Sequence, residues 1–263
     1  MAAGIPPIAV ASARTGIAAL LLFIFARRAI VRSVVVLTRR QRAGVVFAGT
    51  LLAGHFALFF AGLQSTSLVA AVSLLSLEPI AVVLASFVAF RLRPTRLQVL
   101  ALLVATVGAM TVASAAGSGE HRLAGDAMVL GCVVLYGAYV ASARGLRDAM
   151  PAVPYAACVY AVASIVLWPL AIPLTASAWP LPEPAIGYVL ALACIPTLIG
   201  HSLVQVAARR MAPVYVALVS PGETVGSLAI AAFLMHAAPT LVEGTGAGLV
   251  LLGAILAVAA RRR

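Results

Sequence analysis

Two acidic residues lie near the middle of long apolar stretches of the sequence. Glu78 interrupts the stretch 66–90, and Glu223 interrupts the stretch 212–235. A carboxylate at mid-bilayer depth costs at least ~2.5 kcal/mol, so such residues usually face a protein interior and often serve a function. Each has a helix-weakening proline or Pro-Gly pair beside it, and irregular backbone at this depth is tolerated where it lines a cavity. This predicts a proton or substrate pathway, whereas the alternative is two protonated acids that only hydrogen-bond between helices.

Two histidines occupy a second pair of matched positions. Gly54-His55 and Gly200-His201 are 146 residues apart, and the two acids are 145 residues apart. An imidazole inside an apolar span can relay protons or contact a substrate, because it titrates near neutral pH. It can also donate a hydrogen bond between helices, which is worth about 0.6 kcal/mol on average. The structural interpretation is slightly favoured for both.

Arg14 is the one arginine within an apolar span. Because it lies well inside the span, its side chain reaches water with difficulty, and an ion pair with Glu78 or Glu223 is a reasonable expectation. The equally weighted alternative is that the span begins later and that Arg14 sits at the membrane surface.

Further polar and aromatic residues within the spans could line a cavity: Tyr136, Tyr139, Trp168 and Gln205. Tyrosine and tryptophan are more often core or interfacial residues, and Trp168 and Trp179 fit an aromatic belt at the outer membrane surface.

The composition indicates that these residues lie on membrane-spanning helices. The chain is 63% hydrophobic with a mean hydropathy of +1.13, which indicates a protein whose solvent is lipid. We predict an all-α integral membrane fold with nine transmembrane helices: 5–26, 44–63, 66–90, 97–116, 125–143, 155–175, 186–208, 213–235 and 244–260.

The cysteines, Cys132, Cys158 and Cys194, each fall inside a span without metal-binding spacing, which favours free thiols. The spacing of Gly244 and Gly248 favours close helix packing within the bundle over a homodimer contact.

The arginines alternate between the two sides of these spans. All 18 basic residues are arginine, and sixteen follow odd-numbered spans: Arg27, Arg28, Arg32, Arg39, Arg40, Arg42, Arg91, Arg93, Arg96, Arg144, Arg147, Arg209, Arg210 and Arg261 to Arg263. By the positive-inside rule this side is cytoplasmic, the amino terminus is outside and the carboxyl terminus is inside. The net charge of +11 therefore indicates membrane topology, and no nucleic-acid partner is expected.

The matched landmarks indicate a tandem duplication. The register that pairs the two acids also pairs Pro94-Thr95 with Pro239-Thr240, and Gly108 with Gly253. The two copies begin on opposite sides of the membrane, which predicts inverted repeats related by an axis in the membrane plane. We expect a repeat of four spans over residues 1–118 and one of five over residues 119–263, so that the span 125–143 has no upstream counterpart.

The chain resembles the EamA-type members of the drug/metabolite transporter superfamily. The matching segments are GHFALFFAGLQSTSLVAAVSLLSLEPI, IPTLIGHSLVQVAARRMAPVYVALVSPGETVGSLAIAAFL and the stretch PIAVASAR that ends at Arg14. The resemblance implies two five-helix repeats and the export, or in some members import, of amino acids, metabolites or drugs. Two features depart from the family: its first helix is absent, and Ala89-Phe90 and His236-Ala237 stand where Gly-Glu is common.

The sequence contains no phosphate-binding glycine loop, no His-Glu-x-x-His, no Gly-x-Ser-x-Gly and no lysine. We therefore expect no enzyme activity, cofactor or metal, and no ATP-driven transport by this chain alone. The favoured function is secondary transport, as export, of a small metabolite, amino acid or drug-like compound across the plasma (inner) membrane, coupled to protons through Glu78 and Glu223. The alternatives are a membrane scaffold or assembly protein, and a truncated transporter that is inactive without its first helix.

Overall fold

The computed structural model describes residues 5–115, 117, 120–176, 183–234, 236 and 238–260. Within this part of the chain, nine helical segments are long and apolar enough to cross a membrane: Pro7–Val36, Arg39–Ser65, Leu68–Phe90, Arg96–Ser114, Leu123–Gly145, Ala152–Leu174, Ala185–Arg210, Pro213–Leu234 and Leu241–Ala259. They match the nine predicted spans, and the all-α membrane fold is confirmed. Trp179, Ala237 and Arg261 to Arg263, on which other predictions rested, lie outside the described residues.

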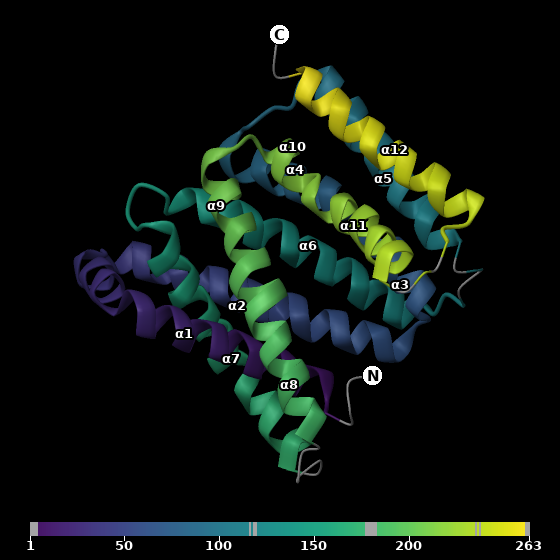
Figure 1. Ribbon diagram of the computed structural model, residues 1–263. Helices are drawn as coiled ribbons and strands as arrows, with labels where there is room; N and C mark the ends of the chain where they lie inside the picture. Colours follow the sequence, from purple (N-terminus) through teal and green to yellow (C-terminus); the bar gives the residue numbers. More distant parts are fainter. Residues whose placement is uncertain are drawn as a thin grey trace. The chain divides into compact units, whose positions relative to one another are not determined.

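Several spans are divided into more than one helix. The elements are α1 (Pro7–Val36), α2 (Arg39–Ser65), α3 (Leu68–Leu75), α4 (Glu78–Phe90), α5 (Arg96–Ser114), α6 (Leu123–Gly145), α7 (Ala152–Ala176), α8 (Glu183–Leu192), the π-helix η1 (Ala193–His201), α9 (Ser202–Arg210), α10 (Pro213–Ala217), α11 (Val219–Leu234) and α12 (Leu241–Ala259) (Figure 1).

Three of these divisions lie four residues before a proline. Helix α3 ends at Leu75 before Pro79, α10 ends at Ala217 before Pro221, and α8 gives way to η1 after Leu192, before Pro196. A proline ring has no N–H and clashes with the carbonyl group of residue i−4, so the regular hydrogen-bond pattern stops there. The divisions are therefore encoded locally. Helix α7, by contrast, continues through two prolines.

The chain forms two compact units, each built from segments of both predicted repeats. Unit 1 comprises Met1–Phe60 and Ser142–Arg210, and unit 2 comprises Ala61–Ala141 and Met211–Arg263. This grouping reflects spatial contacts, and the assignment of the sequence repeats to residues 1–118 and 119–263 stays a prediction.

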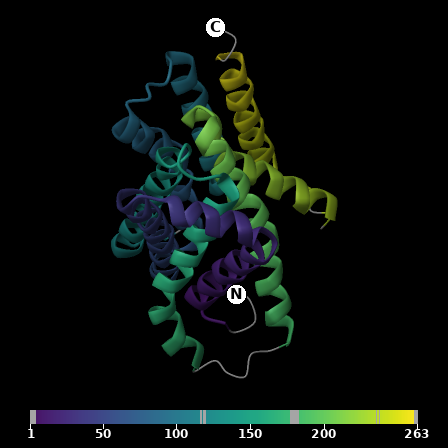
Figure 2. The same ribbon diagram turned by 90° about the vertical axis from the view of Figure 1, so that its left-hand side faces the viewer.

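Unit 1 is built around the pair α1 and α7. Figure 2 shows α1 (purple) between α7 (teal) and α8 (green), and α1 contacts both helices and η1. The hydroxyl group of Ser12 donates to the carbonyl of Ser164 (3.1 Å), and that of Ser164 donates to the carbonyl of Ser12 (2.9 Å). This reciprocal pair joins the two helices without leaving a polar group unsatisfied in an apolar setting.

Unit 2 contains a second close pair, α5 and α12. A Cβ atom added to Gly108 would lie 2.6 Å from the carbonyl oxygen of Gly246, and one added to Gly246 would lie 2.7 Å from that of Gly108. A Cβ atom on Gly253 would lie 2.7 Å from the carbonyl oxygen of Ala101. Shifting each contact by the 145-residue register converts Gly108–Gly246 into Gly253–Ala101. The contact pattern therefore has the two-fold exchange that the duplication predicts.

Two more features repeat at the same register in unit 2. Helices α5 and α12 both begin with a capping box, in which Thr95 pairs with Gln98 and Thr240 with Glu243. The described non-glycine residues with positive φ are Arg91 (58°) and His236 (53°), which are also 145 residues apart. The duplication is therefore visible in backbone conformation as well as in sequence.

The contact made by Gly244 and Gly248 was predicted wrongly. A Cβ atom on either residue would meet nothing within 4 Å among the described residues, whereas Gly246 and Gly253 make the close helix contact. Spacing of four residues places two glycines on one face, but it does not say which face meets a neighbour.

The two acid-bearing spans also differ in whether another helix packs against them. Helix α6 packs on α4 where a Cβ atom on Gly137 would lie 2.6 Å from the backbone of Ala81. The residue equivalent to Ala81 at the 145-residue register is Gly226 on α11, and a Cβ atom there would meet nothing within 4 Å. In the described part of unit 2, α6 thus covers the first copy at a place where the second copy is open.

Candidate functional site

The acid Glu78 is the first residue of α4, directly after the division of its span. Its carboxylate accepts a hydrogen bond from the hydroxyl group of Ser220, with 2.8 Å between Oγ and Oε2. Ser220 lies in the first turn of α11, which also follows a helix break. Two broken helices of unit 2 therefore meet at this hydrogen bond.

The second acid is near the first but has a different environment. Glu78 and Glu223 are close enough for the charge on one to act on the other. Glu223 is exposed in this structure and Glu78 is half-buried. The 145-residue register that relates the two acids relates Ser220 to Leu75, which has no hydroxyl group. The structure thus brings the two predicted acids together but gives only Glu78 the serine partner.

The predicted aromatic pair on α6 belongs to the same unit. Tyr136 and Tyr139 are 9% and 0% exposed, and their ring centroids are 6.3 Å apart. Tyr136 is close enough to Glu78 and Glu223 to interact electrostatically with both. Cys132, one turn earlier on α6, interacts in the same way with Glu78. None of the three cysteines forms a disulfide, as predicted. Among the described residues, no group of three or more His, Cys, Asp or Glu side chains could hold a metal ion.

Three further predicted site residues gather around Phe56 in unit 1: Arg14, His55 and His201. The guanidinium carbon of Arg14 lies 4.3 Å from the centroid of this ring, which is cation–π geometry. His201 meets the same ring edge-on at 5.9 Å, while His55 lies 5.2 Å from it and stacks on Phe59 at 6.5 Å. The matched histidines thus contact one phenylalanine that the sequence reasoning missed. An aromatic residue next to His55 in the sequence was the available signal.

The π-helix η1 ends at His201 and shapes the wall of this cluster. Pro196 cannot donate to the carbonyl of Leu192, and the hydroxyl group of Thr197 donates to that carbonyl instead (2.9 Å). The hydroxyl group of Tyr160 donates to the carbonyl of Thr197 (3.3 Å) and lies 3.1 Å from the hydroxyl of Ser202. π-Helical segments occur frequently at functional sites, and His201 is the last residue of this one.

Arg14 and Gln205 have hydrogen-bonding groups in unit 1 that are unused. Arg14 lies two turns into α1, which begins at Pro7, and its Nε atom is buried without a hydrogen-bond partner. Gln205 is 0% exposed, and neither its Nε2 nor its Oε1 atom has a partner. The ion pair of Arg14 with Glu78 or Glu223, which belong to unit 2, stays a prediction.

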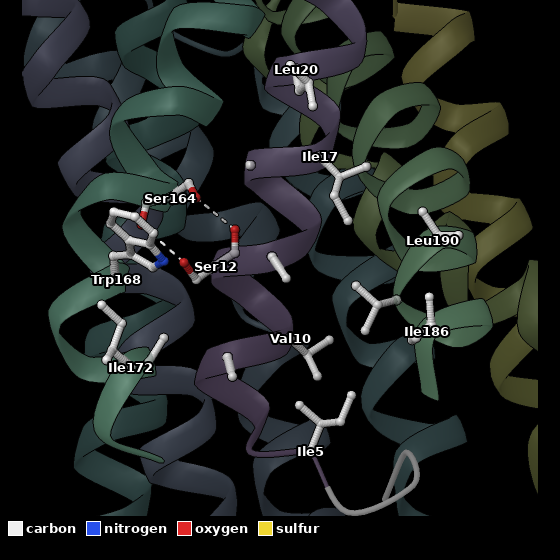
Figure 3. A pocket seen from close by; sticks show the side chains of 15 residues that line it. Ile5, Val10, Ser12, Ile17, Leu20, Ser164, Trp168, Ile172, Ile186 and Leu190 are labelled. Carbon is white, nitrogen blue, oxygen red and sulfur yellow. Dashed lines mark hydrogen bonds between the residues drawn. The ribbon is translucent and has the colours of Figure 1, made fainter. Parts of the chain in front are cut away.

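A groove opens between α1, α7 and α8 in unit 1, with a volume of about 730 Å³. Figure 3 shows Val10, Ile17, Ile186 and Leu190 on one side and Trp168 on the other, with the Ser12–Ser164 hydrogen bonds between them. Its side chains are otherwise apolar, and the two serines satisfy each other. The groove therefore offers apolar surface and little capacity to bind a polar group.

Arg209 has a structural role that the topology argument did not reveal. One of its Nη atoms donates to the carbonyl groups of Leu146, Arg147 and Met150, and its guanidinium carbon lies 5.2 Å from the ring of Tyr155. These carbonyls follow the end of α6, where backbone acceptors lack helical partners. Arg209 thus fastens the α6–α7 connection to α9.

Comparisons with known proteins identify a matching family and a solved structure of similar fold. The model of the EamA-like transporter family matches residues 1–114 and again residues 123–259. A solved crystal structure aligns with 98% of this chain and 89% of its own, with a TM-score of 0.84 and 20% identical residues. At this identity the likeness shows the fold alone. No curated protein matches the sequence.

Proposed function

Because the chain belongs to the EamA-like transporter family, we propose that this multi-pass membrane protein is a proton-coupled secondary transporter. It exports a small metabolite, amino acid or drug-like compound across the plasma (inner) membrane. The observation that carries the proposal is the hydrogen bond between Ser220 and Glu78 at the breaks of two spanning helices. Secondary transporters commonly bind substrates and coupling ions where spanning helices are interrupted near the bilayer midplane.

The coupling step is a change in the strength of this bond. A hydrogen bond to an ionised acceptor is roughly twice as strong as one between neutral groups. Proton binding to Glu78 therefore weakens the connection between α4 and α11 and lets the two helices move about their breaks. Glu223, whose charge acts on Glu78, influences when the proton binds. Release of the proton on the other side restores the bond.

The test compares the neutral variants Glu78→Gln and Glu223→Gln in proteoliposomes that carry a pH gradient. Transport is followed with a panel of labelled amino acids and cationic dyes. We expect Glu78→Gln to abolish the pH dependence of transport while expression and thermal unfolding stay near those of the native chain. Glu243→Gln is the matched control, because that acid belongs to the capping box at the start of α12. Transport that still depends on pH in the Glu78→Gln/Glu223→Gln double variant would refute the proposal.

The orientation is part of the same proposal and rests on the distribution of arginines. A reporter that is active only in the cytoplasm should be active when fused after Arg40. The same reporter fused after Arg122 should be silent. The reverse pattern would exchange the two sides and with them the direction in which the proton gradient acts.

A further inference from the structure

Among the side chains that the structure describes, Arg14 forms no salt bridge with an acid of its own unit. The acids of unit 1 are Asp148 and Glu183. Asp148 lies in the α6–α7 connection and pairs with Arg147 at 3.3 Å, and Glu183 is the first residue of α8. In the described part of unit 1, Arg14 is therefore a cation within a membrane span without a salt-bridge partner. A charge inside a membrane span is normally paired or part of a ligand pathway.

The contact that Arg14 makes leaves its hydrogen-bonding edge available. Its guanidinium carbon lies 4.3 Å from the centroid of the Phe56 ring, and a cation–π contact of this kind uses no N–H donor in a hydrogen bond. The N–H groups point outward in the guanidinium plane, and the buried Nε atom has no partner. An unsatisfied charged donor away from water is unfavourable. A planar guanidinium with a free edge matches the two oxygens of a carboxylate.

The neighbouring groups suit an organic anion with an apolar body. Phe56 and Phe59 provide ring surface, and the His201 ring lies edge-on to Phe56. Gln205 follows His201 by one helical turn and so shares its side of the helix. Its fully buried amide offers a donor and an acceptor that no protein group uses.

We propose that Arg14 binds the carboxylate group of the transported substrate, and that the substrate is a small monocarboxylate with an apolar or aromatic body. This inference rests on the transport function proposed above. A carboxylate is favoured over a phosphate because a single permanent cation balances a single negative charge. The amide of Gln205 serves polar groups on the body of the substrate. The alternative is that Arg14 pairs with Glu78 or Glu223, and the experiment separates the two.

Binding is measured on the purified full chain in detergent, by the shift of the thermal unfolding midpoint with ligand concentration. The probes are phenylacetate, phenylethylamine and 2-phenylethanol, which share a phenyl body and differ in charge, together with hexanoate as a second carboxylate. We expect the two carboxylates to raise the midpoint in a saturable manner and the amine and alcohol to leave it unchanged. Failure of both carboxylates, or an equal effect of the amine, overturns the proposal.

The variant Arg14→Gln should weaken carboxylate binding by about tenfold or more, as expected for the loss of a charge-assisted hydrogen bond. Arg32→Gln, an exposed arginine of the same helix, is the control and should bind as the native chain does. If Arg14→Gln does not fold, Arg14→Lys keeps the charge but loses the two-pronged geometry, and it should still show weaker binding. Unchanged affinity in either Arg14 variant refutes the inference.

The double variants Arg14→Gln/Glu78→Gln and Arg14→Gln/Glu223→Gln test the internal ion pair. If removing an acid restores the stability that Arg14→Gln loses, Arg14 pairs with that acid and the substrate assignment is wrong. The binding assay does not depend on proton movement. Carboxylate binding without any transport would therefore overturn the proposed function and leave the Arg14 site intact, whereas transport without carboxylate binding would do the opposite.

Discussion

Replacement of Gly246 by alanine tests the packing of α5 against α12. The added Cβ atom would lie 2.7 Å from the carbonyl oxygen of Gly108, 2.7 Å from Cγ2 of Val112 and 2.9 Å from its amide nitrogen. Two of these three atoms belong to the backbone and cannot rotate away. The helices must therefore separate locally, which disturbs the neighbouring contact at Gly253 as well.

The size of the effect follows from two opposing contributions. Forcing an extra methyl group into a filled contact costs about 1–3 kcal/mol. Alanine in a helix is more favourable than glycine by roughly 0.5–1 kcal/mol, which offsets part of this cost. We expect Gly246→Ala to lower the free energy of unfolding by about 1–2 kcal/mol, since a backbone clash belongs to the upper part of the overpacking range.

Gly248 provides the matched control on the same helix, two residues further on. A Cβ atom there would meet nothing within 4 Å among the described residues. Gly248→Ala should therefore only gain helix propensity and raise stability by about 0.5–1 kcal/mol. Both variants are compared with the native chain by equilibrium unfolding in mixed micelles. If the two alanines have the same effect, or if Gly248→Ala is the more destabilising, α5 and α12 do not pack through Gly246.

Other consequences of the structure are open to direct measurement. Ser220→Ala removes the hydrogen bond to Glu78 and should reduce the pH dependence of transport in proteoliposomes, because proton binding to Glu78 then no longer changes the connection between α4 and α11. Arg91→Gly relieves a left-handed backbone conformation and should raise stability in thermal unfolding by about 1 kcal/mol. Arg209→Gln leaves the carbonyls after α6 without their donor and should destabilise the fold by about 2–3 kcal/mol, whereas Arg210→Gln, which is exposed, should change stability by less than about 0.5 kcal/mol.

The spans could be predicted from sequence because the bilayer requires about 20 apolar residues in each. The ends of the helices were harder to predict from the sequence. The first span was predicted to end at Ala26, where the apolar run meets arginine. The structure has a kink at that residue (φ −122°, ψ 20°), after which the helix continues to Val36. No proline or glycine follows Ala26 before Val36, so the local sequence does not end the helix where the arginines begin.

The unit 1 cluster was predictable only in part. Matched positions pointed to His55 and His201, and polarity within an apolar span pointed to Arg14 and Gln205. Phe56 joins Arg14 and the two histidines, and its place next to His55 was its one signal in the sequence. The π-helix was hidden, since a proline predicts an interruption but not whether the backbone breaks or widens.

The difference between the two acids follows from where each proline stands relative to its acid. Pro79 follows Glu78 directly, whereas Pro221 precedes Glu223 by two residues, so the prolines differ by three positions in the repeat register. Each proline ends a helix four residues earlier. The break therefore falls immediately before Glu78 but well before Glu223, which lies in the second turn of α11. The same displacement places Ser220 in the first turn of α11, where it can donate to Glu78. The two acids therefore differ in their position within a helix and in their hydrogen-bond partner. The duplication thus supplied two acids, and a shift of one proline made them different.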